Sequence, residues 1–454
     1  MGIASSEPYD PQRVSPVGEH AVVLGASVAG LLAARVLADA FERVTILDRD
    51  PLDAQLQLQP RRGVPQGQHI HVLMVAGQAV MEELAPGLAD DLVAAGANVL
   101  DVSREITVHA AGDFIAEGSA DLPMYYASRP LIEGLLRARI TDYEHIALRP
   151  DYQVIDHLAD PTGTAVTGVV ARSDGEEHRI AAELVVDATG RTSRSTAWRE
   201  QLGYTSPASE SVEVDLAYRS CQLARPPDDR RAILIMPSPP RARGAAVAPI
   251  EDDRWLVTVF GMHGDHPPDH LDGLREFAGT LPTPVVADLL EQHEPVTDDV
   301  ARYRFPASTR RRYDQLEAHP RGLLAVGDAV ASFNPIYGQG MSVAALEALA
   351  LHHTLAEHDD TDLASAFYAR TGSIVDDAWN ISVGGDFQFA ETRGPKPSGT
   401  AVVNRYLSRL HRRAHTDAEL ADAFSRVVVM EQPPRTLFHP RVAWRVLRPS
   451  VTAR

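Results

Sequence analysis

The sequence predicts an α/β fold built on a mainly parallel sheet of βαβ units, with an inserted antiparallel sheet and a helical C-terminal region. Short apolar runs that end in glycine or aspartate occur near residues 25, 187 and 328, as at the ends of buried parallel strands. Between the second and third runs, apolar and polar residues alternate, which is typical of antiparallel strands. Beyond residue 360 the apolar spacing is mainly helical.

Composition narrows the class of protein. The 454 residues carry a formal net charge of −19, which disfavours nucleic acid or an acidic membrane surface as a partner. We find no apolar run of about 18 residues and therefore expect no membrane span. A single cysteine, Cys221, excludes an intramolecular disulfide framework and fits a reducing compartment. These features predict a cytoplasmic enzyme.

The first motif begins with the apolar run at residues 21–24. The tight turn Gly25-Ala26-Ser27-Val28-Ala29-Gly30 follows this predicted strand and leads into a helix. A second strand, at residues 44–47, delivers Asp48 and then Arg49 about 20 residues after the glycine turn. This order is the fingerprint of a Rossmann-like dinucleotide-binding unit.

The residues of this fingerprint have distinct physical roles. Gly25 permits the sharp turn, and Gly30 permits close packing of the helix on the strand. The N–H groups of the helix N-terminus attract a pyrophosphate, and Asp48 would accept hydrogen bonds from ribose hydroxyls. Ser27 replaces the second glycine of the pattern. Either the backbone there lies farther from the phosphates, or the Ser27 hydroxyl donates to them.

Two later motifs end strands that we expect at the same edge of the sheet. The run at residues 184–186 leads to Asp187 and Gly190, and the run at 322–326 leads to Gly327 and Asp328. Asp328 is placed to bind a ribose or ribitol hydroxyl. The next helix is opened by residues 335–341, whose bared N–H groups can stabilise negative charge on a reduced flavin.

Together the three motifs resemble the flavoprotein monooxygenases related to para-hydroxybenzoate hydroxylase. The resemblance implies that Asp187 lies near the FAD pyrophosphate and Asp328 near its ribityl chain. The middle motif departs from the family pattern at residues 188–189. Arg129 opens a predicted helix similar to the family's arginine-led helix, which reaches the FAD phosphates. Val154, on the strand after that helix, is expected to contact adenine through its backbone.

The resemblance implies a complete cofactor site. The residues expected to bind FAD are Gly25, Ser27, Ala29, Gly30, Asp48, Arg49, Arg129, Val154, Asp187, Gly190, Gly327, Asp328, Pro335, Gly338, Gly340 and Met341. The flavin ring is expected to lie beside Pro335, Gly338, Gly340 and Met341. No catalytic acid, base or nucleophile is expected, because oxygen is transferred from a flavin C4a-hydroperoxide.

Other cofactor and partner expectations follow. O2 is the expected co-substrate, and NADPH or NADH the electron donor, either visiting transiently or acting through a separate flavin reductase. His69 and His71 have no further ligands at metal spacing, so no metal site is expected.

A narrower resemblance concerns the reaction. Residues 63–73, 186–191, 328–338 and 376–379 resemble the actinobacterial polyene epoxidases of the lasalocid and monensin pathways. This implies alkene epoxidation of a largely apolar natural-product intermediate, such as a polyene or polycyclic polyketide. Aromatic hydroxylation and a reductase or dehydrogenase of the geranylgeranyl-reductase type are alternatives. A flavin halogenase is less favoured, because the tryptophan pair of that family is missing and the single lysine, Lys396, lies in a proline-glycine loop.

The predicted division of the chain has six parts. These are a flexible tail at 1–18, FAD-binding segments at 19–110, 111–204 and 321–360, an antiparallel-sheet substrate domain at 205–320, and a helical region at 361–454. The second segment could also hold substrate-domain strands. The substrate domain should contain about four strands, which form a platform over the flavin. Helices of the last region are expected to cap the substrate cavity, with Arg409, Arg412 and Arg413 on a solvated helix face.

Overall fold

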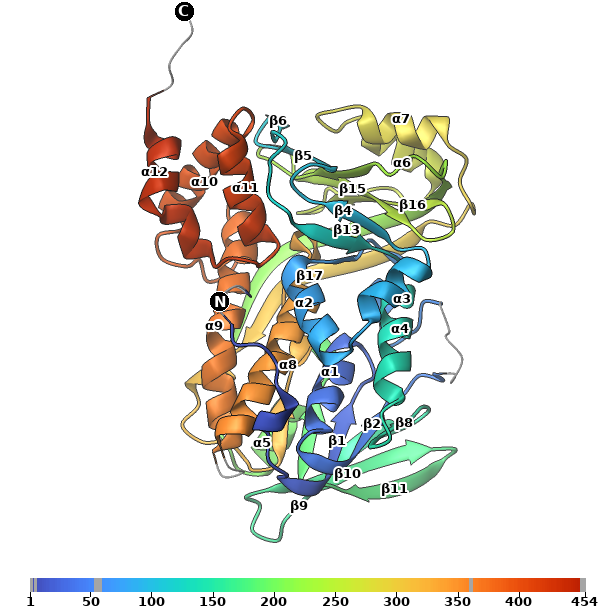
Figure 1. Cartoon of the computed structure of the whole chain (residues 1–454), viewed down its shortest axis with the longest axis vertical. Coiled ribbons are helices and arrows are strands. Elements are labelled where there is room, and N and C mark those ends of the chain that lie inside the picture. The colour runs from blue at the N-terminus through green and yellow to red at the C-terminus, as the bar shows by residue number, and fades with distance from the viewer. Residues whose placement is uncertain (1–2, 4–5, 53–58, 359–361, 450–454) are drawn as a thin grey trace, which may run out of the picture.

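A five-stranded parallel sheet lies in the lower half of the molecule as Figure 1 shows it. The computed structural model describes residues 3, 6–52, 59–358 and 362–449. In order across the sheet the strands are β18 (Leu323–Ala325), β12 (Leu184–Asp187), β1 (Gly18–Leu24), β2 (Phe41–Leu47) and β8 (Ile146–Arg149). All four strand pairs are parallel, as the βαβ pattern predicts.

Both faces of this sheet are buried, each against different elements. Because successive side chains of a strand point to opposite faces, β1 is apolar at consecutive positions. Ala21 and Val23 face a core shared with the helices, whereas Val22 and Leu24 face a core shared with a small antiparallel sheet. The helices of the first core are α1 (Val28–Leu37), α2 (Val75–Leu84), α3 (Leu88–Ala94), α4 (Arg129–Thr141), α8 (Gly340–Glu357) and α9 (Leu363–Asp386). The opposite sheet comprises β9 (Gln153–Ala159), β10 (Val166–Ser173) and β11 (Glu176–Ala181), and α5 (Ser195–Gln201) packs beside it.

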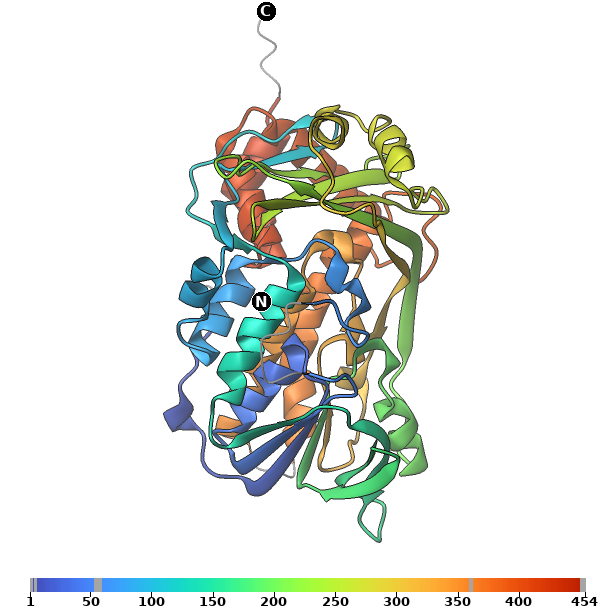
Figure 2. The same ribbon diagram turned by 90° about the vertical axis from the view of Figure 1, so that its right-hand side faces the viewer.

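An eight-stranded sheet lies across the upper half of the molecule (Figure 2). Its order is β19 (Ala331–Ser332), β17 (Ala301–Arg311), β13 (Ser209–Ala224), β16 (Arg254–Gly261), β15 (Arg243–Ile250), β14 (Ala232–Ile235), β5 (Ile106–Ala110) and β6 (Asp113–Phe114). The prediction of about four strands covered only its centre. One face packs on α6 (Leu271–Ala278) and α7 (Val285–Gln292).

Three short strands and three helices complete the upper half. The strands form a separate sheet of β3 (Val72–Leu73), β7 (Pro123–Tyr126) and β4 (Asn98–Asp101). The C-terminal helices α10 (Thr400–Ala414), α11 (Ala418–Val428) and α12 (Pro440–Leu447) share their own apolar core and form a lobe at the upper left of Figure 1. The helical character predicted for this region is confirmed. None of the helices within the described ranges is both long and apolar enough to cross a bilayer.

Three local predictions differ from the structure. The described part of the tail is packed rather than loose, since Tyr9 donates from Oη to Asp39 Oδ2 at 2.5 Å and from its backbone N–H to Glu83. Val154 is not on the strand that follows the arginine-led helix, because β8 comes first and Val154 belongs to β9. Arg409 is not merely solvated, because its Nε donates to the Val446 carbonyl at the end of α12 at 2.7 Å.

The close approach of α1 to β1 can be tested by substitution. A Cβ atom on Gly30 would lie 1.8 Å from the Gly25 carbonyl oxygen, and neither backbone segment can yield. We expect Gly30→Ala to lower the free energy of unfolding by about 3 kcal/mol. Gly384→Ala, on α9, is the matched control, because nothing lies within 4 Å of that added Cβ. Chemical denaturation of both variants measures the difference, and equal stability would show that α1 is misplaced.

Candidate active site

One large cavity joins the two halves of the molecule. Its volume is about 1580 Å³, larger than the roughly 300–1,000 Å³ of an ordinary small-molecule pocket. It runs from the carboxyl ends of β1, β2, β12 and β18 to the exposed face of the upper sheet and on to α10 and α11. The space suits a dinucleotide together with a second molecule. Of the predicted site residues, all but Gly30 line it.

The N-terminus of α1 faces the cavity without a side-chain cap. Gly25 has φ of +100°, which is the left-handed turn that the motif predicts. Ser27 is the N-cap residue, but its side chain makes no capping hydrogen bond. The first N–H groups of α1 are therefore available to an anion. The Ser27 hydroxyl donates to Glu133 Oε2 at 2.7 Å and accepts from Arg129 Nη2 at 2.8 Å.

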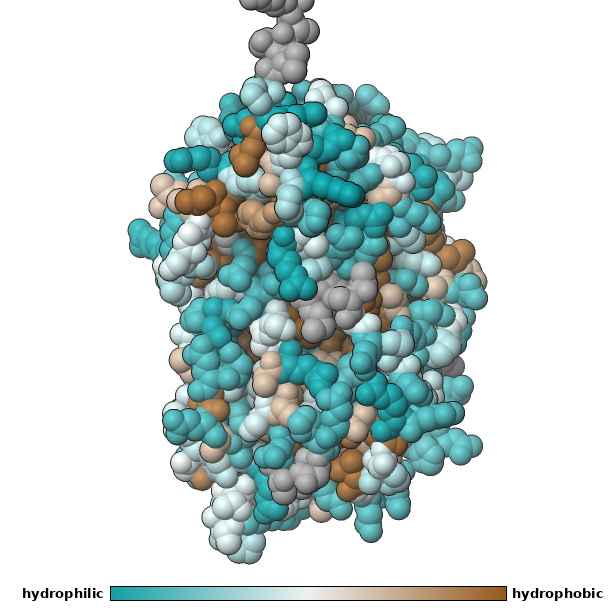
Figure 3. Space-filling model, turned by 60° about the vertical axis from the view of Figure 1, so that its left-hand side comes forward, coloured by the Kyte–Doolittle hydropathy of each residue, from teal (hydrophilic) through white to brown (hydrophobic). Residues whose placement is uncertain are grey.

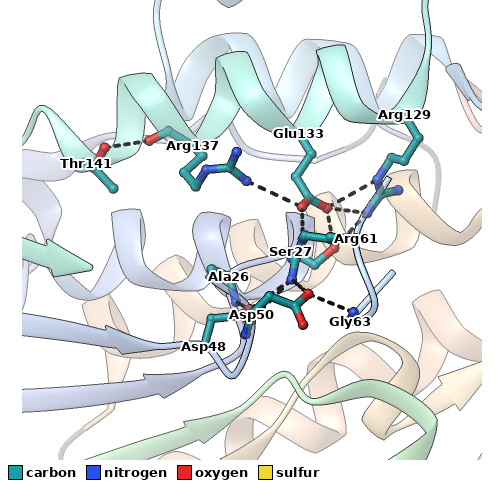
Figure 4. Close-up of polar contacts among 10 residues, drawn as sticks. All are labelled: Ala26, Ser27, Asp48, Asp50, Arg61, Gly63, Arg129, Glu133, Arg137 and Thr141. Atoms are coloured by element: carbon teal, nitrogen blue, oxygen red, sulfur yellow. Dashed lines mark hydrogen bonds and ion pairs between the residues drawn. The ribbon is translucent and has the colours of Figure 1, made fainter. Parts of the chain in front are cut away.

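Three arginines and three acids form a largely buried cluster beside this helix (Figure 4). Its members are Arg61, Arg129, Arg137, Asp48, Asp50 and Glu133. Arg61 Nε donates to Glu133 Oε1 at 2.7 Å and Arg61 Nη1 to Asp50 Oδ2 at 2.8 Å. Burial opposes ionisation of Glu133, but Arg129 and Arg61 outweigh it and lower its pKa. Of this set, only Asp48 and Arg129 were predicted from the sequence.

Asp48 holds the turn of the first motif. Its Oδ2 accepts from the Ala26 N–H at 2.7 Å, and its Oδ1 accepts from the Asp50 N–H at 2.9 Å. Arg61 Nη1 lies 3.2 Å from both oxygens. A carboxylate offers about four acceptor positions, and these four contacts occupy them, the two to Arg61 being the longest. Arg61 and Arg129 both line the cavity and supply cationic donors at its nucleotide end.

Asp187 is fully engaged within its own loop. Its Oδ1 accepts from the Thr189 N–H at 2.9 Å and from the Thr189 hydroxyl at 2.5 Å. Its Oδ2 accepts from Ser193 and Ser195 hydroxyls at 2.7 Å and 2.6 Å. This explains why the loop departs from the glycine-rich family pattern, since side-chain hydroxyls fix it. The carboxylate shapes the cavity wall and has little capacity left for a ligand.

Asp328 is held at the end of β18 by a second buried acid. The Gly327 N–H donates to Glu347 Oε2 at 2.6 Å, and burial raises the pKa of Glu347 to about 8. Asp328 lies deep in the protein but opens to the cavity, where burial raises its pKa and Arg191 and Arg129 oppose that rise. Its protein donor within the described ranges, the Ser332 hydroxyl, is distant at 3.4 Å. Asp328 is therefore available to ligand hydroxyls.

The loop before α8 presents backbone N–H groups to the middle of the cavity. Asn334 Oδ1 accepts from the Ile336 N–H, and Gly338 then turns the chain with φ of +68°. The N-cap residue Gln339 makes no side-chain cap bond, and its buried Oε1 has no partner among the described residues. A Cβ on Gly340 would meet nothing within 4 Å. The uncapped N-terminus of α8 and the unpaired Gln339 Oε1 are both suited to hydrogen bonding with the polar edge of a ligand.

A buried aspartate ties this loop to the end of α9. Asp386 Oδ1 accepts from Asn334 Nδ2 at 2.7 Å and from the Tyr337 hydroxyl at 3.3 Å. Its Oδ2 has no partner within the described chain, and burial raises its pKa to about 7. No local sequence pattern revealed this contact, because 52 residues separate Asp386 from Asn334.

The wall formed by the upper sheet is mostly apolar. Side chains facing the cavity include Ile106, Val108, Leu234, Ala246, Ala248 and Phe260. A polar chain interrupts them, in which Ser220 Oγ lies 2.7 Å from His69 Nδ1 and 2.6 Å from Thr258 Oγ1. Burial lowers the pKa of His69 to about 4, so this histidine is neutral. No three His, Cys, Asp or Glu side chains within the described ranges are grouped as metal ligands.

Comparison with known proteins identifies the family to which the chain belongs. Residues 19–362 match the family model described as FAD binding domain. The chain is 35% identical to protein Rv3254 of Mycobacterium tuberculosis, over 91% of this chain and 90% of that protein. It is 24% identical to kynurenine 3-monooxygenase of Salinispora tropica, over 90% of each. The structure of the flavin-dependent brominase Bmp2 is similar, with a TM-score of 0.64 at 16% identity, covering 91% of this chain and 94% of that one.

The fold and the strand-end site define a dinucleotide-binding flavoprotein. The chain belongs to the FAD-binding domain family and is an enzyme of the FAD-dependent monooxygenase type. FAD is its cofactor, and its family uses O2 and NAD(P)H. The predicted membership of the para-hydroxybenzoate hydroxylase-like group is thereby confirmed, whereas the narrower epoxidase resemblance stays a prediction.

The assignment of Asp328 to FAD can be tested by truncation. Asp328→Ala should weaken FAD binding by about 1–3 kcal/mol, because ligand hydroxyls lose a charged acceptor in a buried site. This is roughly a 5- to 150-fold rise in the dissociation constant, measured by flavin fluorescence titration. Asp121→Ala is the matched control, since the Asp121 side chain is 93% exposed. An unchanged constant in Asp328→Ala would remove this residue from the site.

The buried proton of Asp386 predicts a pH dependence. Between the ordinary pKa of 3.8 and its raised value of about 7, folded Asp386 keeps a proton that the unfolded chain releases. Its contribution to stability therefore falls as pH rises through this window. Asp386→Asn stays neutral, so its stability relative to wild type should improve by ~1–4 kcal/mol across the window. Urea unfolding at several pH values measures this, with the exposed Glu391→Gln as control. A constant difference between variant and wild type would contradict the assignment.

Proposed function

We propose that this enzyme inserts one atom of O2 into a largely apolar natural-product intermediate, with epoxidation of an alkene as the reaction. A polyene or polycyclic polyketide is the substrate class. The observation that carries the proposal is the cavity, which is larger than a cofactor pocket needs to be and has a mostly apolar wall opposite the loop before α8. Such a wall selects substrates by shape and apolar contact.

The chain's own residues supply binding and orientation. The N-terminus of α1, with Arg61 and Arg129, would hold the FAD pyrophosphate, and Asp328 would accept from hydroxyls of its sugar or ribityl chain. The N-terminus of α8 at Gly340 would face the flavin ring and stabilise negative charge there. When bound, FAD carries two electrons from NAD(P)H to O2. One oxygen atom then enters the substrate, and the other leaves as water.

The protein's remaining role is to exclude water from the reacting groups. Phe260, Tyr218 and Phe305 surround the centre of the cavity with apolar and aromatic surface. Burial raises the pKa of Tyr218 well above its ordinary value, so its hydroxyl stays protonated. We assign no side chain as acid, base or nucleophile. The reductant binds transiently, or a separate reductase delivers electrons, and the single buried cysteine supports a cytoplasmic site of action.

Aromatic hydroxylation is the second candidate function. It is supported by the similarity to a protein named kynurenine 3-monooxygenase, which extends over 90% of both chains. Both reactions insert one oxygen atom and differ in the carbon centre that receives it.

Isotope labelling under heavy-isotope oxygen gas tests the proposal. FAD-loaded enzyme is supplied with NAD(P)H and a panel of polyenes and polycyclic aromatic polyketides, and products are analysed by mass. We expect one labelled oxygen atom per product and substrate-stimulated oxidation of NAD(P)H. Products that carry oxygen from water, or halogen from added halide, would exclude a monooxygenase mechanism.

A cavity variant separates substrate binding from cofactor binding. Ala246 is half-exposed to the cavity on β15, so Ala246→Trp fills substrate space far from the strand ends. We expect substrate-stimulated turnover to fall by about tenfold or more while FAD loading is retained. Unchanged turnover would show that the substrate lies elsewhere.

A further inference from the structure

The C-terminal helices expose an unusual concentration of large apolar side chains. Nine such side chains are exposed in the described chain, and five belong to α10, α12 and the 3₁₀ helix Pro434–Phe438 before α12. These five are Val402, Val403, Phe438, Trp444 and Leu447. Val402 is 72% exposed and Trp444 67%. Figure 3 shows brown side chains among teal ones on the upper part of this face, over the C-terminal helices.

Exposed arginines are interspersed among these apolar side chains. They are Arg405, Arg412, Arg435, Arg441 and Arg448, and we call all ten residues the C-terminal surface. On α12, Arg441 lies three residues before Trp444 and Leu447 three residues after it, so the three share one side of the helix. Val402 and Arg405 have the same spacing on α10. Each helix thus mixes apolar and cationic groups on its outer side.

The charge of this region is opposite to that of the whole protein. Residues 400–449 contain nine arginines and four acids, although the chain has a formal net charge of −19. Within the described ranges, Arg405, Arg412, Arg435 and Arg441 form no ion pair, whereas Arg445 and Arg448 both pair with Asp417. The C-terminal surface therefore presents an uncompensated positive charge.

The position of α12 is fixed by hydrogen bonds to α10. Arg409 and Arg413 donate to carbonyl oxygens at the end of α12, including those of Val446 and Arg448. Val446 itself is buried in the core of the lobe. The outer side of α12 is therefore held in a defined orientation and is not a loose terminus.

The C-terminal surface surrounds one end of the cavity. Val403, Arg405, Arg412 and Phe438 are exposed to solvent and also line the cavity. The opposite end, at the strand ends, is bordered by exposed polar residues such as Arg49 and Arg194. The cavity consequently has a mouth framed by apolar and cationic side chains.

We propose that the C-terminal surface docks on an anionic lipid bilayer, so that the mouth opens against the membrane and admits an apolar substrate from it. Tryptophan, leucine and phenylalanine beside arginine are the groups that interfacial helices insert among lipid headgroups. Anionic headgroups attract each arginine near them. The net charge of −19, which by itself disfavours an acidic membrane surface, is screened beyond about 8–10 Å at physiological salt, so the local charge of the docked surface decides. The inference rests on the proposed function only for the nature of the substrate.

A symmetric contact with a second copy fits the same surface less well. A two-fold interface brings one patch against the identical patch of the partner. Five exposed arginines, of which only Arg448 has an acidic partner within the described ranges, would then face five others. An anionic surface removes this repulsion, which favours lipid over self-association.

Trp444 provides a specific reporter for the test. Trp198, Trp255 and Trp379, the other three tryptophans, are at most 1% exposed. FAD-loaded full-length protein is mixed with vesicles of equal parts phosphatidylglycerol and phosphatidylcholine, or with phosphatidylcholine alone. We expect co-sedimentation, a blue shift of tryptophan emission and protection from an aqueous quencher only with the anionic vesicles. Added salt should weaken all three signals.

Two variants keep the reporter and change the surface. Arg441→Glu and Leu447→Ser should each lower the vesicle partition coefficient by about tenfold, through lost charge attraction and lost apolar insertion respectively. Arg179→Glu, on β11, and Val296→Ser, before β17, are exposed matched controls and should bind as wild type does.

Equal binding to neutral vesicles, no binding to anionic ones, or an equal loss in the control variants would overturn the proposal. Protection of Trp444 by self-association without lipid, seen in analytical ultracentrifugation, would overturn it as well. Vesicle binding is measured without substrate. Oxygenation without vesicle binding therefore refutes docking alone, and vesicle binding without oxygenation refutes the proposed function alone.

Discussion

The contact between α1 and β1 is the constraint on which the rest of the site depends. The helix can reach the strand only because Gly30 has no side chain to meet the Gly25 carbonyl. This contact brings the uncapped N-terminus of α1 to the edge of the sheet where Asp48, Asp187 and Asp328 also emerge. Parallel strands with short connections place all their carboxyl ends at that edge. The absence of a side chain at Gly30 thus determines where the nucleotide end of the cavity forms.

The charged cluster beside α1 imposes a second constraint. Arg61, Arg129, Arg137 and three acids are largely withdrawn from water, and the attraction between such charges rarely exceeds the cost of removing them from water. Stability alone is therefore a weak reason for the cluster. Its donors line a cavity whose helix end already attracts anions, so its arrangement is better explained by cofactor binding. The acids keep the arginines oriented, and Arg61 and Arg129 retain further N–H groups for phosphate oxygens.

Local sequence patterns predicted the elements that depend on residues close together in the chain. Strand, turn and helix around Gly25 and before Gly340 follow from apolar spacing and from glycine at turns, and the predicted residues gather at one cavity. The long-range contacts were not predictable in this way. Arg61 and Glu133 are 72 residues apart, and β5 joins β14 across more than a hundred residues, with no local signal for either pairing. The upper sheet was therefore predicted at half its width, and Arg61, Glu133 and Asp386 were missed.

The geometry of the cavity also bears on how a substrate reaches it. A dinucleotide held along the strand ends would fill the end bordered by Arg49 and Arg194, so a substrate must enter from elsewhere. The mouth between Val403 and Phe438 meets that requirement. An apolar molecule is poorly soluble in water, and passage directly from a bilayer would avoid exposing it. The same apolar wall that keeps water from the reacting groups thus continues outward to a surface suited to lipid. Cofactor binding and substrate entry are then separated at opposite ends of one cavity.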